Sequence, residues 1–282
     1  MKVLVTGADG YLGRGVVEKL LEGGHEVLGF GLGEAPRVYD APSFSYEQCD
    51  VMKLNSEELS DLNPDVVVHL AWRNGFRHRE VSHIDDLPGH YAFIRSCVKA
   101  GVPKVAVMGS MHEVGYHEGA VSADTPCRPT TPYAIAKNAL RQLATAECSE
   151  SETDLLWMRG YYIVSADGLG DSIFSKIIKA EKEGKRTFPF TTGKNKYDFL
   201  DYSEFCSKVA RLAADHSAIG IENVCSGKPE SLASRVERFI EENNLSIRLE
   251  YGAFPDRPYD SPAIWGETNE SSGAKPTSEE LR

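Results

Sequence analysis

Three features are scarce or missing in this 282-residue sequence, and each absence excludes a class of protein. The six cysteines form no CxxC pair, and no histidine pair lies near them at zinc-ligand spacing, so we expect reduced thiols and no metal site. No apolar run approaches ~18 residues, the length that a membrane-spanning helix needs. The N-terminal MKVLVTG enters a strand without the segments of a signal peptide. We therefore expect no membrane partner and a cytoplasmic location.

Positive charge is also scarce, because 31 Lys and Arg stand against 42 Asp and Glu, a formal net charge of −11. Nucleic acids and anionic membranes attract basic surfaces, so this balance argues against both as the main partner. An acidic protein can still bind an anionic ligand through local backbone donors, such as those at a helix N-terminus.

The first two thirds of the chain alternate short apolar runs with stretches of helical periodicity. The runs at 2–6, 25–30, 65–71 and 104–108 are apolar nearly throughout, which is typical of parallel strands covered on both faces. Helices are expected between them, and crossovers between parallel strands are right-handed. The predicted fold class is therefore α/β, a doubly wound parallel sheet, with a smaller and more irregular C-terminal lobe after Ser226.

A glycine-rich turn, TGADGYLG at 6–13, follows the first strand and opens the first helix. Gly7, Gly10 and Gly13 have the placement that a dinucleotide loop needs. Glycines let the backbone approach a pyrophosphate, and the helix N-terminus stabilises its charge. The alternative is a glycine-rich turn that binds nothing.

The end of the second strand bears on the choice of cofactor. It reads Phe30-Gly31-Leu32-Gly33, without the acid that normally binds the ribose hydroxyls. Without that acid a 2′-phosphate is not repelled, so the sequence favours NADP(H) over NAD(H), with Arg37 as a candidate phosphate partner. Asp50 and Val51 follow a short third strand and are candidates to line the adenine, or Asp50 is an ordinary helix-capping acid.

Tyr133 and Lys137, in PYAIAKN at 132–138, lie four residues apart and so on one face of a helix. Tyrosine has an ordinary pKa near ~10, too high for efficient acid–base work at neutral pH. We expect the neighbouring ammonium to lower that pKa and to reach a ribose hydroxyl, which makes the two residues a candidate catalytic pair. A pair on the protein surface is the alternative.

A second candidate segment is the turn GSMHEVGY at 109–116, after a buried strand. Ser110 and His112 are candidates to polarise a substrate carbonyl, and Glu113 is a candidate base. Two plainer alternatives remain open: Ser110-x-x-Glu113 has the spacing of a capping box, and His112 is an ordinary turn residue.

The glycine turn, His69-Leu70-Ala71, Ser110 with Val114, and YAIAK together resemble the extended short-chain dehydrogenase/reductase family, in its NAD-dependent epimerase/dehydratase branch. The resemblance covers most of 1–226. It implies a Rossmann domain at 1–159 to which 197–226 returns, and a lobe at 160–196 and 227–282 that binds a nucleotide sugar. It also implies a homodimer formed through the helix from Leu87 and the helix of Tyr133. The implied cofactor contacts are Gly7, Gly10, Tyr11, Leu12, Asp50, Val51, Leu70, Ala71, Trp72, Tyr133 and Lys137.

One departure matters: the catalytic Ser or Thr of that family aligns with Met111, whose thioether cannot donate a hydrogen bond. The MHE-x-GY turn and PYAIAKNALR also resemble 4-keto-6-deoxysugar reductases. The expected function is NAD(P)H-dependent reduction of the 4-keto group of a nucleoside-diphosphate 4-keto-6-deoxyhexose, in deoxysugar and polysaccharide biosynthesis. The alternatives are a nucleotide-sugar 4-epimerase with retained NAD and a degenerate nucleotide-binding regulator. Candidate substrate contacts are Arg73 beside the sugar and Lys194, Asn195 and Arg257 at the diphosphate.

Overall fold

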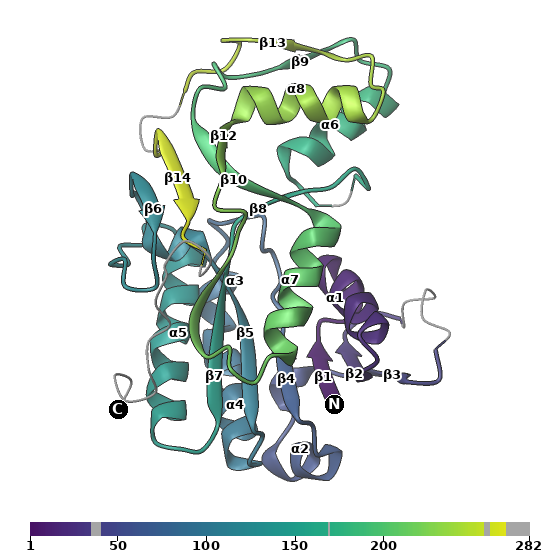
Figure 1. Cartoon of the computed structure of the whole chain (residues 1–282), viewed down its shortest axis with the longest axis vertical. Coiled ribbons are helices and arrows are strands. Elements are labelled where there is room, and N and C mark those ends of the chain that lie inside the picture. The colour runs from purple at the N-terminus through teal and green to yellow at the C-terminus, as the bar shows by residue number, and fades with distance from the viewer. Residues whose placement is uncertain (35–40, 169, 257–259, 269–282) are drawn as a thin grey trace. The chain divides into compact units, whose positions relative to one another are not determined.

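The computed structural model describes residues 1–34, 41–168, 170–256 and 260–268. Two compact units can be distinguished along the chain in Figure 1. The first comprises Met1–Gly115, Cys127–Gly160 and Tyr202–Glu222, and the second comprises Tyr116–Pro126, Tyr161–Asp201 and the residues from Asn223 on. Arg37 and Arg257, both expected to contact phosphate, lie outside the described residues, as does the tail beyond Thr268.

The first unit is built on a seven-stranded sheet in the order β11-β7-β5-β4-β1-β2-β3. Its strands are β1 Lys2–Thr6, β2 Glu26–Gly31, β3 Phe44–Gln48, β4 Val66–His69, β5 Lys104–Ser110, β7 Asp154–Gly160 and β11 Gly220–Val224. The pairings from β3 through β7 are all parallel. This is the strand order of doubly wound dinucleotide-binding sheets, so the predicted fold class is confirmed. The order reverses between β1 and β4, and such sheets bind their ligands at the carboxyl ends of the strands there.

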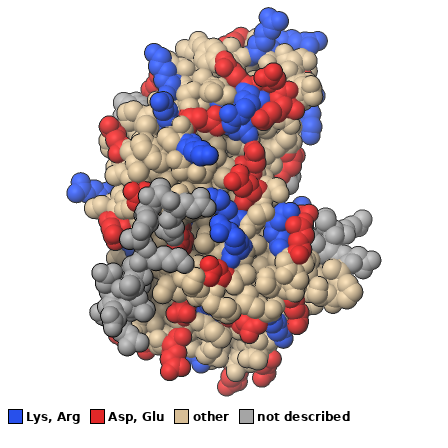
Figure 2. All heavy atoms as spheres, viewed as in Figure 1, with Lys and Arg blue, Asp and Glu red and all other residues tan. Residues whose placement is uncertain are grey.

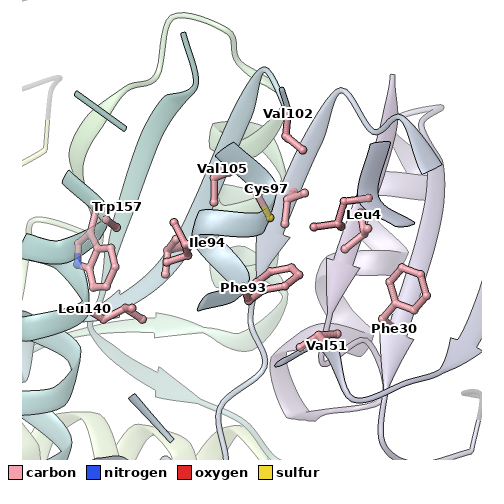
Figure 3. Packing of buried hydrophobic residues seen from close by; sticks show 14 residues of the cluster. Leu4, Phe30, Val51, Phe93, Ile94, Cys97, Val102, Val105, Leu140 and Trp157 are labelled. Atoms are coloured by element: carbon pink, nitrogen blue, oxygen red, sulfur yellow. The ribbon is translucent and has the colours of Figure 1, made fainter. Parts of the chain in front are cut away.

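Helices cover both faces of this sheet. They are α1 Tyr11–Glu22, α2 Ser56–Leu62, α3 Ser82–Asp85, α4 Leu87–Lys99, α5 Pro132–Ser149 and α7 Tyr202–Ala214, with short 3₁₀ helices η1 Val51–Lys53 and η2 Met111–Val114. On one face α1 packs with α7, and on the other α4 packs with α2 and α5. The core between the sheet and α4 and α5 includes Leu4, Val105, Phe93, Leu140 and Trp157 (Figure 3). Alternate strand residues therefore anchor the helix that carries the tyrosine–lysine pair.

The start of α5 is fixed by its local sequence. The Thr131 side chain accepts a hydrogen bond from the Ala134 N–H, and Pro132 occupies the first turn, where its missing N–H costs nothing. The second residue of this helix is Tyr133, so the cap and the proline determine where the phenol stands.

The second unit has a sheet in the order β12-β10-β14-β6, with β8 paired to β10, and a separate pair of β13 with β9. The strands are β6 Gly119–Val121, β8 Tyr162–Val164, β9 Thr187–Pro189, β10 Lys196–Asp201, β12 Pro229–Ser231, β13 Arg248–Glu250 and β14 Ala263–Gly266; the helices are α6 Ile173–Lys182 and α8 Leu232–Glu242. The expectation of an irregular lobe after Ser226 is wrong, because α8 runs for 11 residues and buries Val236 and Phe239.

The described residues also bear on surface charge, on membrane-spanning helices and on thiol or metal sites. Figure 2 shows one face, on which basic side chains lie among acidic ones. Within the described ranges, no helix combines the length and the apolar character needed to cross a bilayer. All six cysteines are free thiols, and the described residues contain no cluster of three or more His, Cys, Asp or Glu arranged for a metal ion.

Candidate active site

The glycine turn between β1 and α1 is a tight backbone cradle. Gly7 has φ +66°, and a Cβ there would lie 2.9 Å from the Ala71 backbone. A Cβ on Gly13 would lie 1.9 Å from the Gly7 carbonyl oxygen, so helix and turn approach as closely as only glycine allows. No side chain caps the N-terminus of α1 at Gly10. Backbone N–H groups therefore face this end of the sheet, which fits the pyrophosphate of a dinucleotide.

A buried chain of hydrogen bonds joins the end of β1 to the end of β4. The Thr6 hydroxyl oxygen accepts from the N–H groups of Leu70 and Ala71, both at 3.1 Å. Its own proton is therefore directed to His69 Nδ1, 2.8 Å away. His69 Nε2 then donates to His90 Nδ1 at 2.9 Å, an assignment that follows from the accepting role of Nδ1. These hydrogen bonds fix the ends of β1 and β4. In doubly wound sheets, a dinucleotide lies between the two strand ends at this position.

His69 and His90, the two histidines of this hydrogen-bond chain, are uncharged at neutral pH. Burial, with a smaller contribution from the nearby Lys137, lowers the pKa of His69 to about 3. Burial, with smaller contributions from His69 and Lys137, lowers the pKa of His90 to about 2. His90 Nε2 has no hydrogen-bond partner among the described residues. The sequence did not single out His90, although a histidine on an otherwise apolar helix face is visible in it.

The Tyr133 ring lies among aromatic and histidine side chains from three segments. His78 stacks on it with ring centroids 4.6 Å apart and an interplanar angle of 8°. His83 and Trp72 meet it edge-on at 5.1 and 6.2 Å, and His112 at 6.3 Å. The structure thus brings the predicted tyrosine together with Trp72, His78 and His83, all from the segment that follows β4.

The protonation of Tyr133 differs from the sequence-based expectation. Burial, with a smaller contribution from the negative charge of Glu113, raises the pKa of its phenol to about 12. A hydrogen bond from the Ser110 hydroxyl lowers it, but less than burial raises it. The prediction of an acidified phenol is therefore wrong for the polypeptide by itself, and Tyr133 keeps its proton at neutral pH.

Lys137 is buried one helical turn beyond Tyr133. Its Nζ donates to the Met108 carbonyl oxygen at 2.7 Å and lies 3.7 Å from the ring centroid of Trp72. Burial lowers its pKa to about 7, and the Glu113 carboxylate offsets part of that effect. Its surroundings therefore disfavour the ammonium form, and the positive charge beside the phenol is weaker than the spacing predicted.

The turn after β5 buries Ser110, Met111 and Glu113 and leaves His112 partly exposed. The Ser110 hydroxyl accepts from the His112 N–H at 3.3 Å, and the Ser110 N–H donates to Glu113 Oε1 at 2.6 Å. These contacts form a capping box, which was the plainer alternative for Glu113. Met111 is buried, with 5% of its surface exposed. Ser110, one residue before the aligned position, is thus the hydroxyl that reaches Tyr133.

Glu113 lies in the interior and has no exposed surface. Its carboxylate accepts from Trp157 Nε1 at 3.0 and 3.1 Å and lies 3.7 Å from Arg159 Nε. Burial raises its pKa, although Arg159 and these hydrogen bonds act against the rise. This geometry suits a group that fixes the turn better than one that reaches a substrate.

His112 is partly exposed and meets the His78 ring edge-on at a centroid distance of 4.5 Å. Burial lowers its pKa to about 3, and the neighbouring His78 contributes. The imidazole is neutral at neutral pH, so it can donate or accept a hydrogen bond there but supplies no charge.

The remaining predicted contacts are more dispersed. Asp50 caps η1, where it accepts from the Met52 N–H at 3.3 Å, while Val51 is buried in the core. Arg73 is exposed and forms a two-point ion pair with Asp86. In the second unit Lys194 is exposed, and Asn195 Nδ2 donates to the Ser261 carbonyl oxygen at 3.2 Å.

Tyr11 and Leu12 begin α1 and are partly buried. The Tyr202 hydroxyl donates to the Tyr11 carbonyl oxygen and accepts from the Gly15 N–H at 3.2 Å. A Cβ on Gly15 would meet that hydroxyl at 2.7 Å. Tyr202 therefore fixes the first turn of α1 in place, a role that the sequence did not reveal.

Comparison with known proteins adds independent findings. The family model for the NAD dependent epimerase/dehydratase family matches residues 3–225. The dTDP-6-deoxy-L-talose 4-dehydrogenase (NAD(+)) of Aggregatibacter actinomycetemcomitans is 43% identical, over 94% of this chain and 99% of the relative. The UDP-glucose 4-epimerase of Mycolicibacterium smegmatis is 26% identical, over 96% and 89%. The structure of MoeE5 with UDP-glucuronic acid and NAD is similar with a TM-score of 0.78 and 25% identity, over 97% and 92%.

Proposed function

We propose that this chain, which belongs to the NAD dependent epimerase/dehydratase family, interconverts a ketone and an alcohol at C4 of a dTDP-6-deoxyhexose. In this proposal the enzyme works as a reductase of the 4-keto sugar. The family and its relatives make the chain an NAD(P)-dependent oxidoreductase that acts on a nucleotide sugar. The finer proposal rests on one observation, the protonated phenol of Tyr133 with Ser110 bonded to it at the carboxyl end of the sheet.

The glycine cradle fits a dinucleotide, and the nicotinamide of that cofactor, when bound, supplies the hydride for C4. The turn of Gly7, Gly10 and Gly13 would let the pyrophosphate approach the backbone closely, and N–H groups in the first turn of α1 would receive it. The Gly10 N–H itself donates to the Gly7 carbonyl oxygen at 2.9 Å and closes the turn. Tyr11, Leu12, Leu70, Ala71 and Trp72 complete the proposed cofactor contacts. We assign Lys137 to a ribose hydroxyl, because its amine can make further hydrogen bonds besides the one to Met108.

Tyr133 is the proposed proton donor to the C4 oxygen. A ketone that accepts hydride becomes an alkoxide, and an alkoxide is a far stronger base than a phenolate. A phenol with a pKa of about 12 therefore gives up its proton readily at that moment, although it holds it firmly beforehand. The Ser110 hydroxyl then stabilises the phenolate left behind, since its hydrogen bond favours the charged form.

The protonation state favours reduction as the working direction. Oxidation of a C4 alcohol needs a phenolate at Tyr133, and burial opposes that form. Reduction needs the neutral phenol, which the polypeptide already provides. We assign His112 and His78, whose rings are in contact, to orient the sugar by hydrogen bonds, and Glu113 to act only through the turn that it fixes.

The direct test is turnover. Purified protein is mixed with a dTDP-4-keto-6-deoxyhexose and with NADH or NADPH, and the loss of reduced-nicotinamide absorbance is followed while NMR identifies the product at C4. We expect consumption of the reduced cofactor and a dTDP-6-deoxyhexose with a new C4 hydroxyl. When NAD⁺ is supplied as the hydride acceptor, the same protein should oxidise dTDP-6-deoxy-L-talose slowly in the reverse direction.

Failure in both directions would contradict the proposal. If, in addition, the protein were purified with tightly held NAD and converted UDP-glucose to its C4 epimer, the epimerase alternative would replace it. A protein that binds dinucleotide and turns over neither kind of sugar would point to a regulatory member of the family.

A further inference from the structure

The carboxylate of Asp9 lies at the carboxyl end of β2, although Asp9 itself belongs to the glycine turn. Asp9 Oδ2 accepts a hydrogen bond from the Gly33 N–H at 2.7 Å. A Cβ on Gly31, the last residue of β2, would lie 2.0 Å from Asp9 Oδ1. The carboxylate therefore occupies the space in which the side chain at the end of β2 would otherwise begin.

The glycines at the end of β2 make room for this carboxylate. A Cβ on Gly33 would lie 2.6 Å from Asp9 Oδ2. Gly31 and Gly33 do not have positive φ, so backbone conformation does not demand glycine at either position. The demand is one of space, since any larger residue at 31 or 33 would push the Asp9 carboxylate away.

Hydrogen bonds hold both ends of this contact. Tyr46 on β3 donates from its hydroxyl to the Gly33 carbonyl oxygen at 2.7 Å. Arg14 Nε donates to the Asp9 carbonyl oxygen at 2.9 Å. The backbone on both sides of the Asp9–Gly33 hydrogen bond is thus held in place, and the carboxylate lies against the end of β2.

The end of β2 is where doubly wound dinucleotide-binding sheets recognise the adenosine ribose. An acid there accepts a hydrogen bond from the ribose 2′-hydroxyl, and the same negative charge repels a 2′-phosphate. Residues 30–33 of this chain contain no acid, which led the sequence to favour NADP(H). In three dimensions the missing carboxylate is present, supplied from the preceding turn.

We propose that Asp9 is the residue that recognises the adenosine ribose and selects NAD(H) over NADP(H). It replaces in space the acid that β2 lacks in sequence. This inference depends on the family's dinucleotide binding and not on which sugar the enzyme reduces. The role of Asp9 can therefore fail while the proposed sugar reduction stands, and the sugar reduction can fail while the role of Asp9 stands.

The test is equilibrium binding without any sugar substrate. The quenching of tryptophan fluorescence gives the Kd of NADH and of NADPH, and competition by AMP and by adenosine 2′,5′-bisphosphate isolates the ribose contribution. Wild-type protein should bind NADH more tightly than NADPH by about 10- to 100-fold, the range of one charge-assisted hydrogen bond. The Asp9→Asn variant keeps the shape of the side chain and removes its charge, and it should bring the two Kd values to within about threefold of each other.

A matched control comes from Glu34, an exposed carboxylate just beyond β2. Glu34→Gln removes the same charge from the same region and should leave the NADH to NADPH ratio unchanged. Gly31→Ala is a second route to the same carboxylate, because its methyl group would lie 2.0 Å from Asp9 Oδ1. It should weaken the preference for NADH even if Asp9→Asn does not fold.

Three results would overturn the proposal. The first is wild-type protein that binds NADPH as tightly as NADH. The second is a folded Asp9→Asn or Gly31→Ala variant that keeps the wild-type ratio, and the third is a loss of the ratio in Glu34→Gln.

Discussion

Lys137 is expected to make the protein less stable where it is charged. Its pKa falls from 10.5 to about 7 because the side chain is buried, a difference of 3.5 units. At about 1.4 kcal/mol per unit, this corresponds to a penalty of about 5 kcal/mol for the charged form in the folded protein. The replacement Lys137→Met removes the titrating group and keeps most of its apolar stem.

The sign of the pH dependence follows from proton binding. Between pH 7 and pH 10.5 the unfolded chain carries a proton on Lys137 and the folded protein does not. The free energy of unfolding of the wild type therefore rises with pH in this window, and the full penalty is present below pH 7. From pH 7.5 to pH 9.5 the wild type should gain about 3 kcal/mol relative to Lys137→Met.

Urea unfolding of both proteins at pH 7.5, 8.5 and 9.5 measures this difference. The hydrogen bond lost to Met108 shifts the comparison by a constant, so the slope with pH is the informative quantity. Lys99→Met, at an exposed site on α4, is the matched control and should follow the wild type. Parallel pH profiles for wild type and Lys137→Met would refute the reasoning about its burial.

Two further outcomes are expected, one at the glycine turn and one among the buried histidines. Gly13→Ala should abolish measurable NADH binding and lower the free energy of unfolding by about 1–3 kcal/mol, since its Cβ would lie 1.9 Å from the Gly7 carbonyl oxygen. Gly75→Ala, whose Cβ would meet nothing within 4 Å, should change neither quantity, and equal losses in both variants would contradict the close-approach argument. The folded-state pKa values of His69, His90 and His112, about 3, 2 and 3, lie below their ordinary 6.5, so the unfolded chain binds more protons there. Stability should therefore fall as pH drops below 6.5, by up to about 4 kcal/mol per unit for the three together, and His90→Asn should remove about a third of that slope. Urea unfolding between pH 6.5 and pH 4.5 measures it, and a flat profile would contradict the lowered pKa values of these rings.

Local sequence rules predicted the parts of the site that depend on neighbours along the chain. Gly7, Gly10 and Gly13, between a strand and a helix, predict the glycine turn. Thr131 and Pro132 predict the start of α5. The spacing of Tyr133 and Lys137 places them one turn apart. These features depend on backbone geometry, which short sequence patterns encode directly.

Properties that depend on tertiary burial could not be predicted in this way. The sequence placed an ammonium beside the phenol, but packing directs Lys137 to Met108 and Trp72 and raises the pKa of Tyr133. Asp9 and Gly33 are 24 residues apart along the chain, with α1 and β2 between them, so the sequence of residues 30–33 does not reveal this contact.

The second unit also contains one element that the local sequence predicts and others that depend on contacts distant in sequence. Leu232, Val236 and Phe239 lie at helical spacing, so α8 was readable from sequence, and the prolines after Ser226 masked it. The short strand β14 pairs with β10 on one side and, across more than a hundred residues, with β6 on the other, and no local pattern contains these pairings.

The account depends most on Tyr133 as the donor of a proton to the C4 oxygen. The measurement that tests it most directly is a single turnover of NADH-loaded protein with a dTDP-4-keto-6-deoxyhexose, followed by stopped flow in wild type and Tyr133→Phe. The variant should still bind NADH, and its rate of NADH oxidation should fall by about 10²- to 10⁴-fold, the usual contribution of a positioned acid. A Tyr133→Phe protein that binds NADH and reduces the sugar at the wild-type rate would contradict the account.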